Sequence, residues 1–209
     1  MLRWMVRTAA FVVCLMAAQA ALAQTEFSAD MVNTGRDGSP VQGKIYFARD
    51  KMRFESAEKA QRGMGGALIM NLATQTSTVI MDQQHIYMEV PAQMASQRVA
   101  YNFFRTGDAE AACADYLQQA RNKGGSCHKV GSETVNGRST VKYEGTSASG
   151  ESSTFWIDPK LRFPVKWQGS NNSSGELRNI QEGTQPASLF EIPAGYTKMD
   201  MGGMMKRPQ

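Results

Sequence analysis

The stretch Phe155-Trp156-Ile157-Asp158-Pro159-Lys160-Leu161-Arg162-Phe163-Pro164-Val165-Lys166-Trp167 decides the fold. Its apolar residues alternate with other residues, which is typical of strands whose side chains point to opposite faces. Proline fixes φ and disfavours helix in the residue before it, so Asp158-Pro159 turns the chain. Pro164 stands near the start of the second strand, where a missing N–H is tolerated. The stretch predicts a β-hairpin of a mainly β protein.

The N-terminus has the pattern of a secretory signal peptide. Arg3 and Arg7 give it a positive start, residues 9–18 are apolar, and Ala-Leu-Ala at residues 21–23 is a small-x-small cleavage site. The apolar run is too short to serve as a membrane anchor. We therefore expect a signal peptide over residues 1–23 and a mature protein in the periplasm of a Gram-negative bacterium.

The mature chain has room for one domain with a sizeable core, since 209 − 23 leaves 186 residues. Cleavage after Ala20 is the alternative. Removal of Arg3 and Arg7 lowers the net charge from +4 to +2. That excess is too small to indicate nucleic-acid binding, and charges of both signs are interspersed. We expect a domain at residues 24–198, a methionine-rich tail at 199–209, and no transmembrane segment in the mature form.

Two cysteines, Cys113 and Cys127, remain in the mature chain. In an oxidising periplasm such a pair is most often a disulfide. This one would close a loop of about 15 residues, which is worth roughly 3 kcal/mol in the chain-entropy model. The alternative is a redox or metal site that includes His128, but these residues are fewer than the four ligands of a structural zinc site. The sequence therefore predicts a disulfide.

Most of the mature chain has strand patterns. Arg49-Asp50 and Asn136-Gly137 are tight turns that join neighbouring strands into hairpins. Besides the hairpin quoted above, we expect strands over residues 27–32, 44–48, 51–55, 68–72, 76–81, 85–90, 130–135, 139–144 and 176–182. Some ten or eleven antiparallel strands in sequential order predict a strongly curved sheet that forms an incomplete β-barrel.

A helical island interrupts the strands. Residues 92–104 are a candidate helix, and residues 109–123 are a clearer one because their apolar side chains fall on one face. Asp108 is the expected N-cap of this helix, and Gly124-Gly125 is its expected stop. The predicted disulfide would tie the helix to the strand that begins near Cys127.

Several segments around the hairpin carry a family resemblance. Val135-Asn136-Gly137-Arg138 precedes it, Leu177-Arg178-Asn179-Ile180 follows it, and the chain then reaches Ser188-Leu189-Phe190-Glu191-Ile192-Pro193-Ala194-Gly195-Tyr196. This order resembles the LolA-like superfamily of periplasmic proteins, and especially an uncharacterised branch of it. The resemblance implies an incomplete barrel whose open mouth is covered by helices and which holds acyl chains or another apolar ligand. Founding members carry lipoproteins, and relatives carry lipids or sense envelope stress.

One face of the expected sheet collects the residues that would line such a cavity. Methionine is flexible and polarizable, and it is common on surfaces that accept varied apolar partners. The simpler interpretation is that these residues form an ordinary core, as every sheet needs an apolar face. The candidate ligand-binding residues are Met31, Ile45, Phe47, Met52, Phe54, Met70, Met81, Ile86, Met88, Phe155, Ile157, Val165 and Trp167.

Patterns typical of enzymes are weak in this sequence. The two histidines, His85 and His128, both lie on expected strands, and no Gly-x-Ser-x-Gly motif presents a nucleophile. The segment 38–44 imitates a phosphate-binding loop, but it contains Pro40 and leads into a strand. We therefore expect neither catalysis nor a cofactor.

Three binding functions follow from these observations. The first is a periplasmic carrier or chaperone that holds a lipid, an acyl chain or a lipoprotein in the half-barrel. The second is a sensor or adaptor that binds an envelope protein through the concave sheet. The third is copper binding by the tail, because soft thioethers select Cu(I). Its candidate ligands are Met199, Met201, Met204 and Met205.

Overall fold

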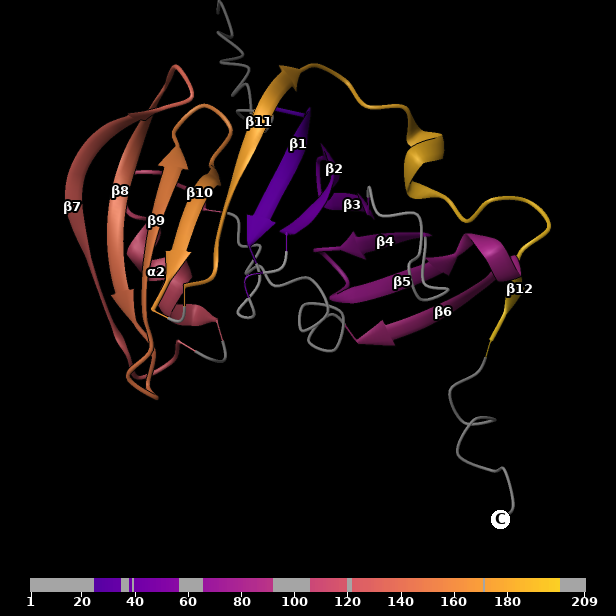
Figure 1. Ribbon diagram of the computed structural model, residues 1–209, viewed down its shortest axis with the longest axis horizontal. Coiled ribbons are helices and arrows are strands. Elements are labelled where there is room, and N and C mark those ends of the chain that lie inside the picture. Colours follow the sequence, from indigo (N-terminus) through magenta and orange to yellow (C-terminus); the bar gives the residue numbers. More distant parts are fainter. Residues whose placement is uncertain are drawn as a thin grey trace, which may run out of the picture.

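The computed structural model describes residues 25–34, 38, 40–56, 66–91, 106–119, 122–170 and 172–199. The strands among these residues form one curved, mainly antiparallel sheet that does not close into a barrel (Figure 1). None of the described helices is long and apolar enough to span a membrane. The expected signal peptide and the candidate helix at 92–104 lie outside the described residues.

Twelve strands make up the sheet, in the order β12-β6-β5-β4-β3-β2-β1-β11-β10-β9-β8-β7. All neighbours are antiparallel except β12 and β6, which are parallel. The strands are β1 (Phe27–Thr34), β2 (Pro40–Ala48), β3 (Lys51–Ser56), β4 (Gly66–Asn71), β5 (Thr76–Met81), β6 (Ile86–Pro91), β7 (Ser126–Val135), β8 (Arg138–Thr146), β9 (Ser152–Asp158), β10 (Phe163–Gly169), β11 (Ser174–Glu182) and β12 (Thr197–Lys198).

The predicted incomplete barrel is confirmed, and so are its tight turns. Arg49 and Asn136 both have a positive φ, at 50° and 49°, as the short hairpin loops require. The strand count rises to twelve because the two-residue β12 adds to eleven antiparallel strands. In Figure 1, β7 to β10 run upright while β4 to β6 run across the view, so the sheet turns strongly between them.

The main core lies on the concave face of this sheet. Successive residues of a strand point to opposite faces, and Phe27, Ala29 and Met31 of β1 all point into the core and are buried. The rings of Phe27, Phe47 and Phe163 are mutually in contact, with centroid distances of 5.5 Å for each pair. These three rings join β1, β2 and β10 at one end of the concave face, which we call the phenylalanine end.

Helix α2 (Ala112–Gln118) is shorter than the helix predicted at residues 109–123. The carbonyl of Ala109 accepts a hydrogen bond of 2.7 Å from the Tyr143 hydroxyl, and it is therefore engaged with the sheet. Asp108 is not the N-cap, because its carboxylate accepts from the Glu110 N–H and closes a turn ahead of the helix. Tertiary contacts thus replace the first helical turn that the sequence favours.

The predicted cysteine pair is joined in a disulfide, with its Cα atoms 5.4 Å apart. Cys113 lies on α2 and Cys127 on β7, so the bond ties the helix to an edge strand of the sheet. The Tyr116 ring stacks on Phe155 at 5.0 Å and lies directly over Gly145, where a Cβ would overlap it. Helix α2 is therefore fixed to β7, β8 and β9 by a covalent bond and by aromatic packing.

A C-terminal strap, residues 183–199, crosses the convex face from β11 to β6 (Figure 1). It contains the 3-10 helix η2 (Ala187–Phe190), and a second 3-10 helix, η1 (Asp82–Gln84), joins β5 to β6. Phe190 packs on Ala67, Ile69 and Ile80 in a second, smaller apolar cluster. Residues 189–196, which belong to the last segment of the family resemblance, therefore fasten the convex side of the sheet.

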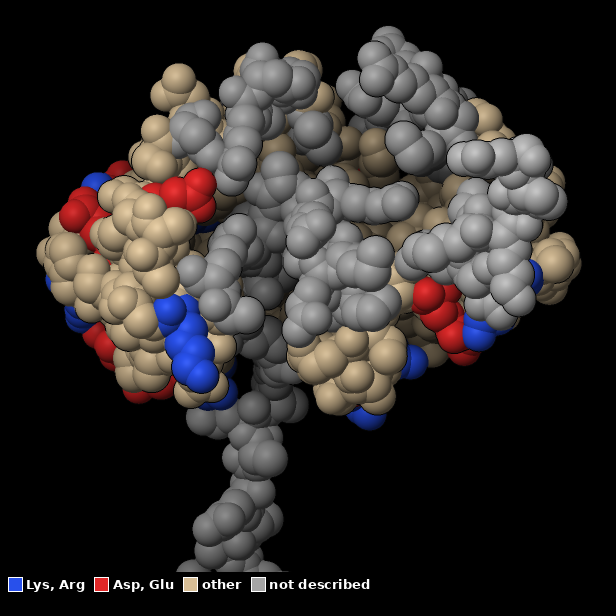
Figure 2. All heavy atoms as spheres, turned by 90° about the horizontal axis from the view of Figure 1, so that it is seen from below, with Lys and Arg blue, Asp and Glu red and all other residues tan. Residues whose placement is uncertain are grey.

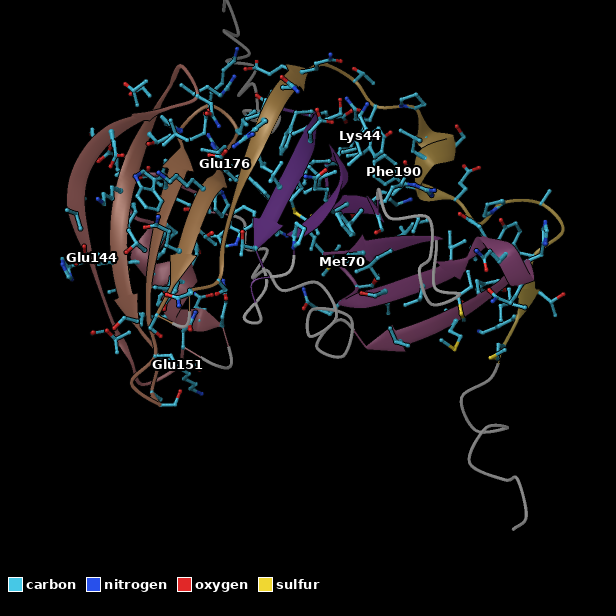
Figure 3. The ribbon with its side chains drawn as sticks, in the orientation of Figure 1. Lys44, Met70, Glu144, Glu151, Glu176 and Phe190 are labelled. Atoms are coloured by element: carbon cyan, nitrogen blue, oxygen red, sulfur yellow. A yellow bond between two sulfur atoms is a disulfide. The ribbon has the colours of Figure 1, made fainter. Side chains whose placement is uncertain are left out.

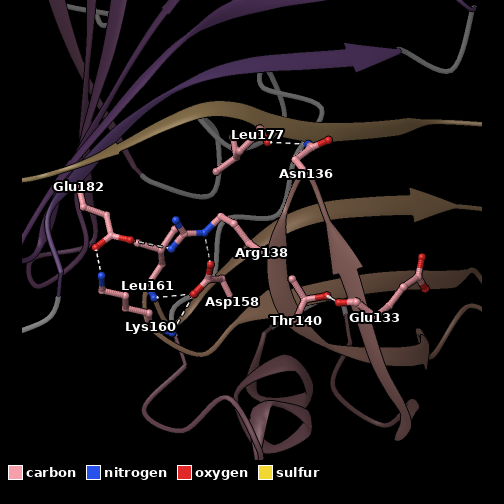
Figure 4. Close-up of polar contacts among 9 residues, drawn as sticks. All are labelled: Glu133, Asn136, Arg138, Thr140, Asp158, Lys160, Leu161, Leu177 and Glu182. Carbon is pink, nitrogen blue, oxygen red and sulfur yellow. Dashed lines mark hydrogen bonds and ion pairs between the residues drawn. The ribbon is translucent and has the colours of Figure 1, made fainter.

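A charged network fastens the other part of the sheet (Figure 4). Arg138 of β8 binds the carboxylates of Asp158 and Glu182, and Lys160 also binds Glu182. Asp158 is 2% exposed and accepts the N–H groups of Lys160 and Leu161, which shapes the predicted turn between β9 and β10. The network therefore links β8, the β9–β10 turn and β11.

Candidate functional site

The concave face has two parts that differ in composition. We call strands β3 to β6 the methionine half, because Met52, Met70, Met81 and Met88 point to the concave side there. We call β7 to β10 with α2 the disulfide half. No methionine occurs between residues 95 and 198, so the disulfide half has none. The two halves meet at β1, β2 and β11 in the middle of the sheet.

Strand pairing aligns the residues of the methionine half in rows across the sheet. In one row Phe47, Met52, Met70, Ser77 and Val90 are successive cross-strand partners. Neighbouring side chains in such a row are about 5 Å apart, close enough to make a continuous surface. The rows predict a broad apolar floor that is interrupted at one point by the hydroxyl of Ser77.

All thirteen predicted ligand-binding residues lie on described strands. Met81 is partly buried against the main core, and Ile86 is half-buried. The other eleven are buried within the core cluster, namely Met31, Ile45, Phe47, Met52, Phe54, Met70, Met88, Phe155, Ile157, Val165 and Trp167. Their placement on one face follows the predicted alternation, and their role in binding stays a prediction.

The end of the concave face opposite the phenylalanine end contains two glycines, and we call it the glycine end. Gly43 of β2 lies beneath the Phe54 ring, and Gly175 of β11 lies beneath the Trp167 ring and the amide of Asn33. A Cβ at either glycine would overlap these side chains, so the missing side chains make room for them. At the glycine end, the Phe54 ring, the Trp167 ring and the Asn33 amide therefore pack directly on the backbone of the two glycines.

Two polar side chains of this face have no hydrogen-bond partner. Asn33 is 2% exposed with both amide atoms unpaired, and Ser77 is 1% exposed with an unpaired hydroxyl. The sequence reasoning missed Asn33, although the same period of two that gave Phe27, Ala29 and Met31 includes it. The alternation of the strand already places Asn33 on the concave face, but a search for periodic apolar residues passes over a polar side chain.

The convex face of the disulfide half is a charged outer surface. The Trp156 ring lies beneath the ammonium groups of Lys142 and Lys166, at 5.1 and 4.5 Å from its centroid. Its indole N–H donates to Glu133, and this bond, followed by Lys142, holds the pKa of the Glu133 carboxyl below its ordinary value. Glu144 also lies on the outer side, as Figure 3 shows. Seen from below, the described charges lie mainly on the two flanks (Figure 2).

A hollow of about 410 Å³ opens between the β7–β8 turn and β11, lined by Asn136, Arg138, Leu177, Arg178, Asn179 and Ile180. Its two guanidinium groups are already neutralised. Arg138 is bound to Asp158 and Glu182, and Arg178 is bound to Glu176. The Asn136 amide donates to the Leu177 carbonyl. This arrangement stabilises the turn and leaves little free charge for a ligand.

The histidines and the other candidate metal ligands are not gathered into one group in the described part of the chain. The described residues contain no group of three or more His, Cys, Asp or Glu that would hold a metal ion. His85 packs on the Tyr196 ring, and His128 lies exposed beside Glu144. Met199 packs against the main core, while the other three candidate copper ligands lie outside the described residues. Copper binding by the tail therefore stays a prediction.

Comparison with solved structures identifies the fold. An uncharacterized conserved protein from Thermus thermophilus matches with a TM-score of 0.55 at 10% identity, over 85% of this chain and 91% of that chain. MucB in the Pseudomonas aeruginosa MucA/MucB complex matches with a TM-score of 0.51 at 15% identity, over 84% of this chain and 58% of that chain. This chain thus spans less than two thirds of MucB.

A LolA superfamily protein from Nitrosomonas europaea also matches, at 11% identity over 81% of this chain and 90% of that chain, with a lower TM-score of 0.39. No protein-family model matches the sequence, and the comparison with curated proteins found no match. The open curved sheet confirms the predicted incomplete β-barrel, and the matches to the Thermus thermophilus protein and to MucB show that solved structures share this fold. At these identities the likeness is one of fold.

Proposed function

We propose that the protein is a periplasmic binding protein that holds an acyl chain of a lipid or lipoprotein on the concave face of its half-barrel. The observation that supports this proposal most strongly is the apolar floor of the methionine half. Four methionines from four adjacent strands share one face there, and the residues of each row are cross-strand neighbours. Unbranched thioether side chains can repack around chains of different length, which suits a carrier.

Three further observations support a periplasmic location. The sequence begins with a signal-peptide pattern, and MucB has been solved in complex with MucA(peri). A disulfide between Cys113 and Cys127 suits an oxidising compartment. The unpaired groups and apolar side chains of the concave face favour non-covalent binding over catalysis, because a reaction needs a positioned nucleophile or acid–base pair.

A protein partner is the second candidate for the same face. The solved MucA/MucB complex gives this fold a precedent for binding another protein. A partner segment that carries apolar side chains would use the same methionine floor. The two candidates differ in the molecule that is bound, so a test that weighs the bound molecule separates them.

The direct test is native mass spectrometry of the full chain purified from its own periplasm. We expect a complex heavier than the protein by the mass of one acyl lipid, released as free lipid on activation. A polypeptide mass in its place would establish the adaptor function. Protein that carries neither molecule and does not bind added dodecanoic acid would contradict the proposal.

A matched pair of variants locates the site. Met70 and Ile69 are neighbours on β4, with Met70 on the concave side and Ile69 in the convex cluster beneath Phe190; Figure 3 labels Met70 and Phe190. Met70→Phe is expected to lower dodecanoic acid affinity about tenfold by filling the floor, whereas Ile69→Phe leaves it unchanged. Circular dichroism checks that both variants are folded. Equal affinities would exclude the methionine half as the binding site.

A further inference from the structure

Asn33 lies on the concave face among apolar side chains at the glycine end. It follows Met31 by two residues on β1, and its backbone pairs with Gly175 of β11, which in turn pairs with Trp167 of β10. The positions of Asn33 Oδ1 and the Trp167 ring over Gly175 bring the amide and the indole together. The amide is therefore aimed across the concave surface.

An unpaired amide at this position is costly. A buried polar group without a hydrogen bond lowers stability, and native proteins pair nearly all such groups. Both the Nδ2 and the Oδ1 atoms of Asn33 are unpaired at 2% exposure. Leucine has nearly the same shape and would avoid this cost. A partner from outside the folded chain accounts for an amide here.

The surroundings define the chemistry of that partner. Met31, Leu177 and Trp167 are the buried neighbours of the amide, so most of the partner must be apolar. The amide N–H groups donate to a carbonyl oxygen, and the Oδ1 atom accepts an N–H or O–H. A carbonyl at the head of an alkyl chain meets these requirements.

The opposite end of the face limits the direction of the chain. The three rings of the phenylalanine end, Phe27, Phe47 and Phe163, fill the space there by mutual contact. An alkyl chain whose head lies at Asn33 is therefore directed across the strands toward Phe54 and the methionine floor. The glycine end and the methionine half then form one site with a polar head position and an apolar body.

Building on the proposed function, we infer that Asn33 is the polar anchor of the ligand site and binds the carbonyl of an acyl amide, ester or acid, with Trp167 against the head group. Ser77 is the matched comparison. Its hydroxyl is equally buried and equally unpaired, but it lies within the methionine floor between Met70 and Val90. The anchor function is assigned to Asn33 and not to Ser77.

The test uses three ligands with the same alkyl chain length and different heads. The affinities are measured by displacement of the dye 1-anilinonaphthalene-8-sulfonate from the full mature chain. The ligands are N-methyldodecanamide, dodecanoic acid and 1-chlorododecane, and only the first two carry a carbonyl. We expect the wild type to bind the carbonyl ligands about tenfold more tightly than 1-chlorododecane, as one hydrogen bond in a dry site supplies that ratio. The amide and the acid separate an amide-linked acyl group from a free fatty acid.

Two substitutions complete the test. Asn33→Leu is expected to equalise the three affinities without lowering the urea midpoint, and Ser77→Ala is expected to retain the preference. Asn33→Ala replaces Asn33→Leu if the latter does not fold. A preference that survives in the Asn33 variant, or is absent from the wild type, would overturn the anchor and leave the proposed function intact. Failure of all three ligands to bind the wild type would overturn both.

The urea midpoint of Asn33→Leu provides an independent test of the anchor. If Asn33→Leu lowers the urea midpoint, the amide is hydrogen-bonded in the unliganded protein, for example to an ordered water, and Asn33 is then a structural residue and not the anchor. If the midpoint rises while the carbonyl preference disappears, Asn33 costs stability and supplies selectivity. That pair of results is the one we expect.

Discussion

The disulfide half and the methionine half are parts of one sheet, yet they are built differently. In the disulfide half, Tyr116 of α2 stacks on Phe155, which also stacks on Tyr143, and a disulfide fixes the helix. In the methionine half, Met70 and Met88 share the concave surface with aliphatic neighbours and are 5–6% exposed. Rings have few rotamers and thioethers have many. The first half is rigid by composition, and the second is adaptable.

This difference assigns separate tasks to the two halves. A sheet that binds alkyl chains of different length needs a rigid framework and a surface whose side chains can repack. The Arg138 network and α2 supply the frame at one edge, while the strap fastens the convex side of the other part through Phe190. The concave methionines are then free to adjust without loss of the strand register beneath them.

The largest expected contrast comes from truncating one buried side chain in each half. Ile157 is fully buried in the disulfide half and Met70 is its counterpart of similar volume. We expect Ile157→Ala to cost about 4 kcal/mol because rigid neighbours cannot fill the cavity, and Met70→Ala to cost about 2 kcal/mol because other methionines can. Urea unfolding of both variants measures the difference. Equal costs would contradict the division of the sheet into a rigid and an adaptable half.

Much of this division could be predicted from the sequence. Local rules suffice for the turn at Asn136-Gly137, whose residue types favour a positive φ, whereas the turn at Arg49-Asp50 is indicated by the strand patterns on either side of it. The period of two likewise puts the predicted apolar residues on one face. The disulfide could be predicted because the mature chain has two cysteines and the expected compartment is oxidising.

The features that depend on distant contacts were not predictable in the same way. The first turn of the predicted helix is lost to the hydroxyl of Tyr143, which lies 34 residues from Ala109 in the chain. Trp156 points outward from the sheet yet is 2% exposed, because lysine side chains from two neighbouring strands cover it. Whether the Asn33 amide finds a hydrogen-bond partner depends on all the residues that surround it in the folded protein. Such facts belong to the folded chain and not to any local pattern.

Removal of the disulfide has the next largest expected effect. The double substitution Cys113→Ser and Cys127→Ser opens a loop of about 15 residues and should cost roughly 3 kcal/mol. The loss is expected to fall on α2 and β7, which the bond joins, and on β8, which pairs with β7. Hydrogen exchange should accelerate there and remain unchanged in β3 to β6. Acceleration spread equally over both halves would mean that the sheet opens as one unit.

The smallest expected effect is a dependence on acid that is confined to the disulfide half and the adjoining strand β11. The hydrogen bonds from Lys160 and then Arg138 hold the pKa of the Glu182 carboxyl below its ordinary value of 4.5. A carboxyl whose pKa is depressed by folding adds stability above its unfolded pKa, and this stability is lost as the pH falls through the folded pKa. Glu182 is one part of a network that also holds Asp158, so its loss loosens the contact between β8 and β11.

Urea midpoints between pH 7 and pH 3 measure this dependence. Glu182→Gln should be less stable than the wild type at pH 7 and should approach it toward pH 3, because the wild type loses its ion pairs as the carboxyl is protonated. Glu191→Gln, on the strap, is the control and should retain the wild-type profile. If the acid loss persists in Glu182→Gln, other carboxyls carry it. Hydrogen exchange at pH 4 then distinguishes the halves, because the network predicts earlier opening at β8 and β11 than at β4 and β5.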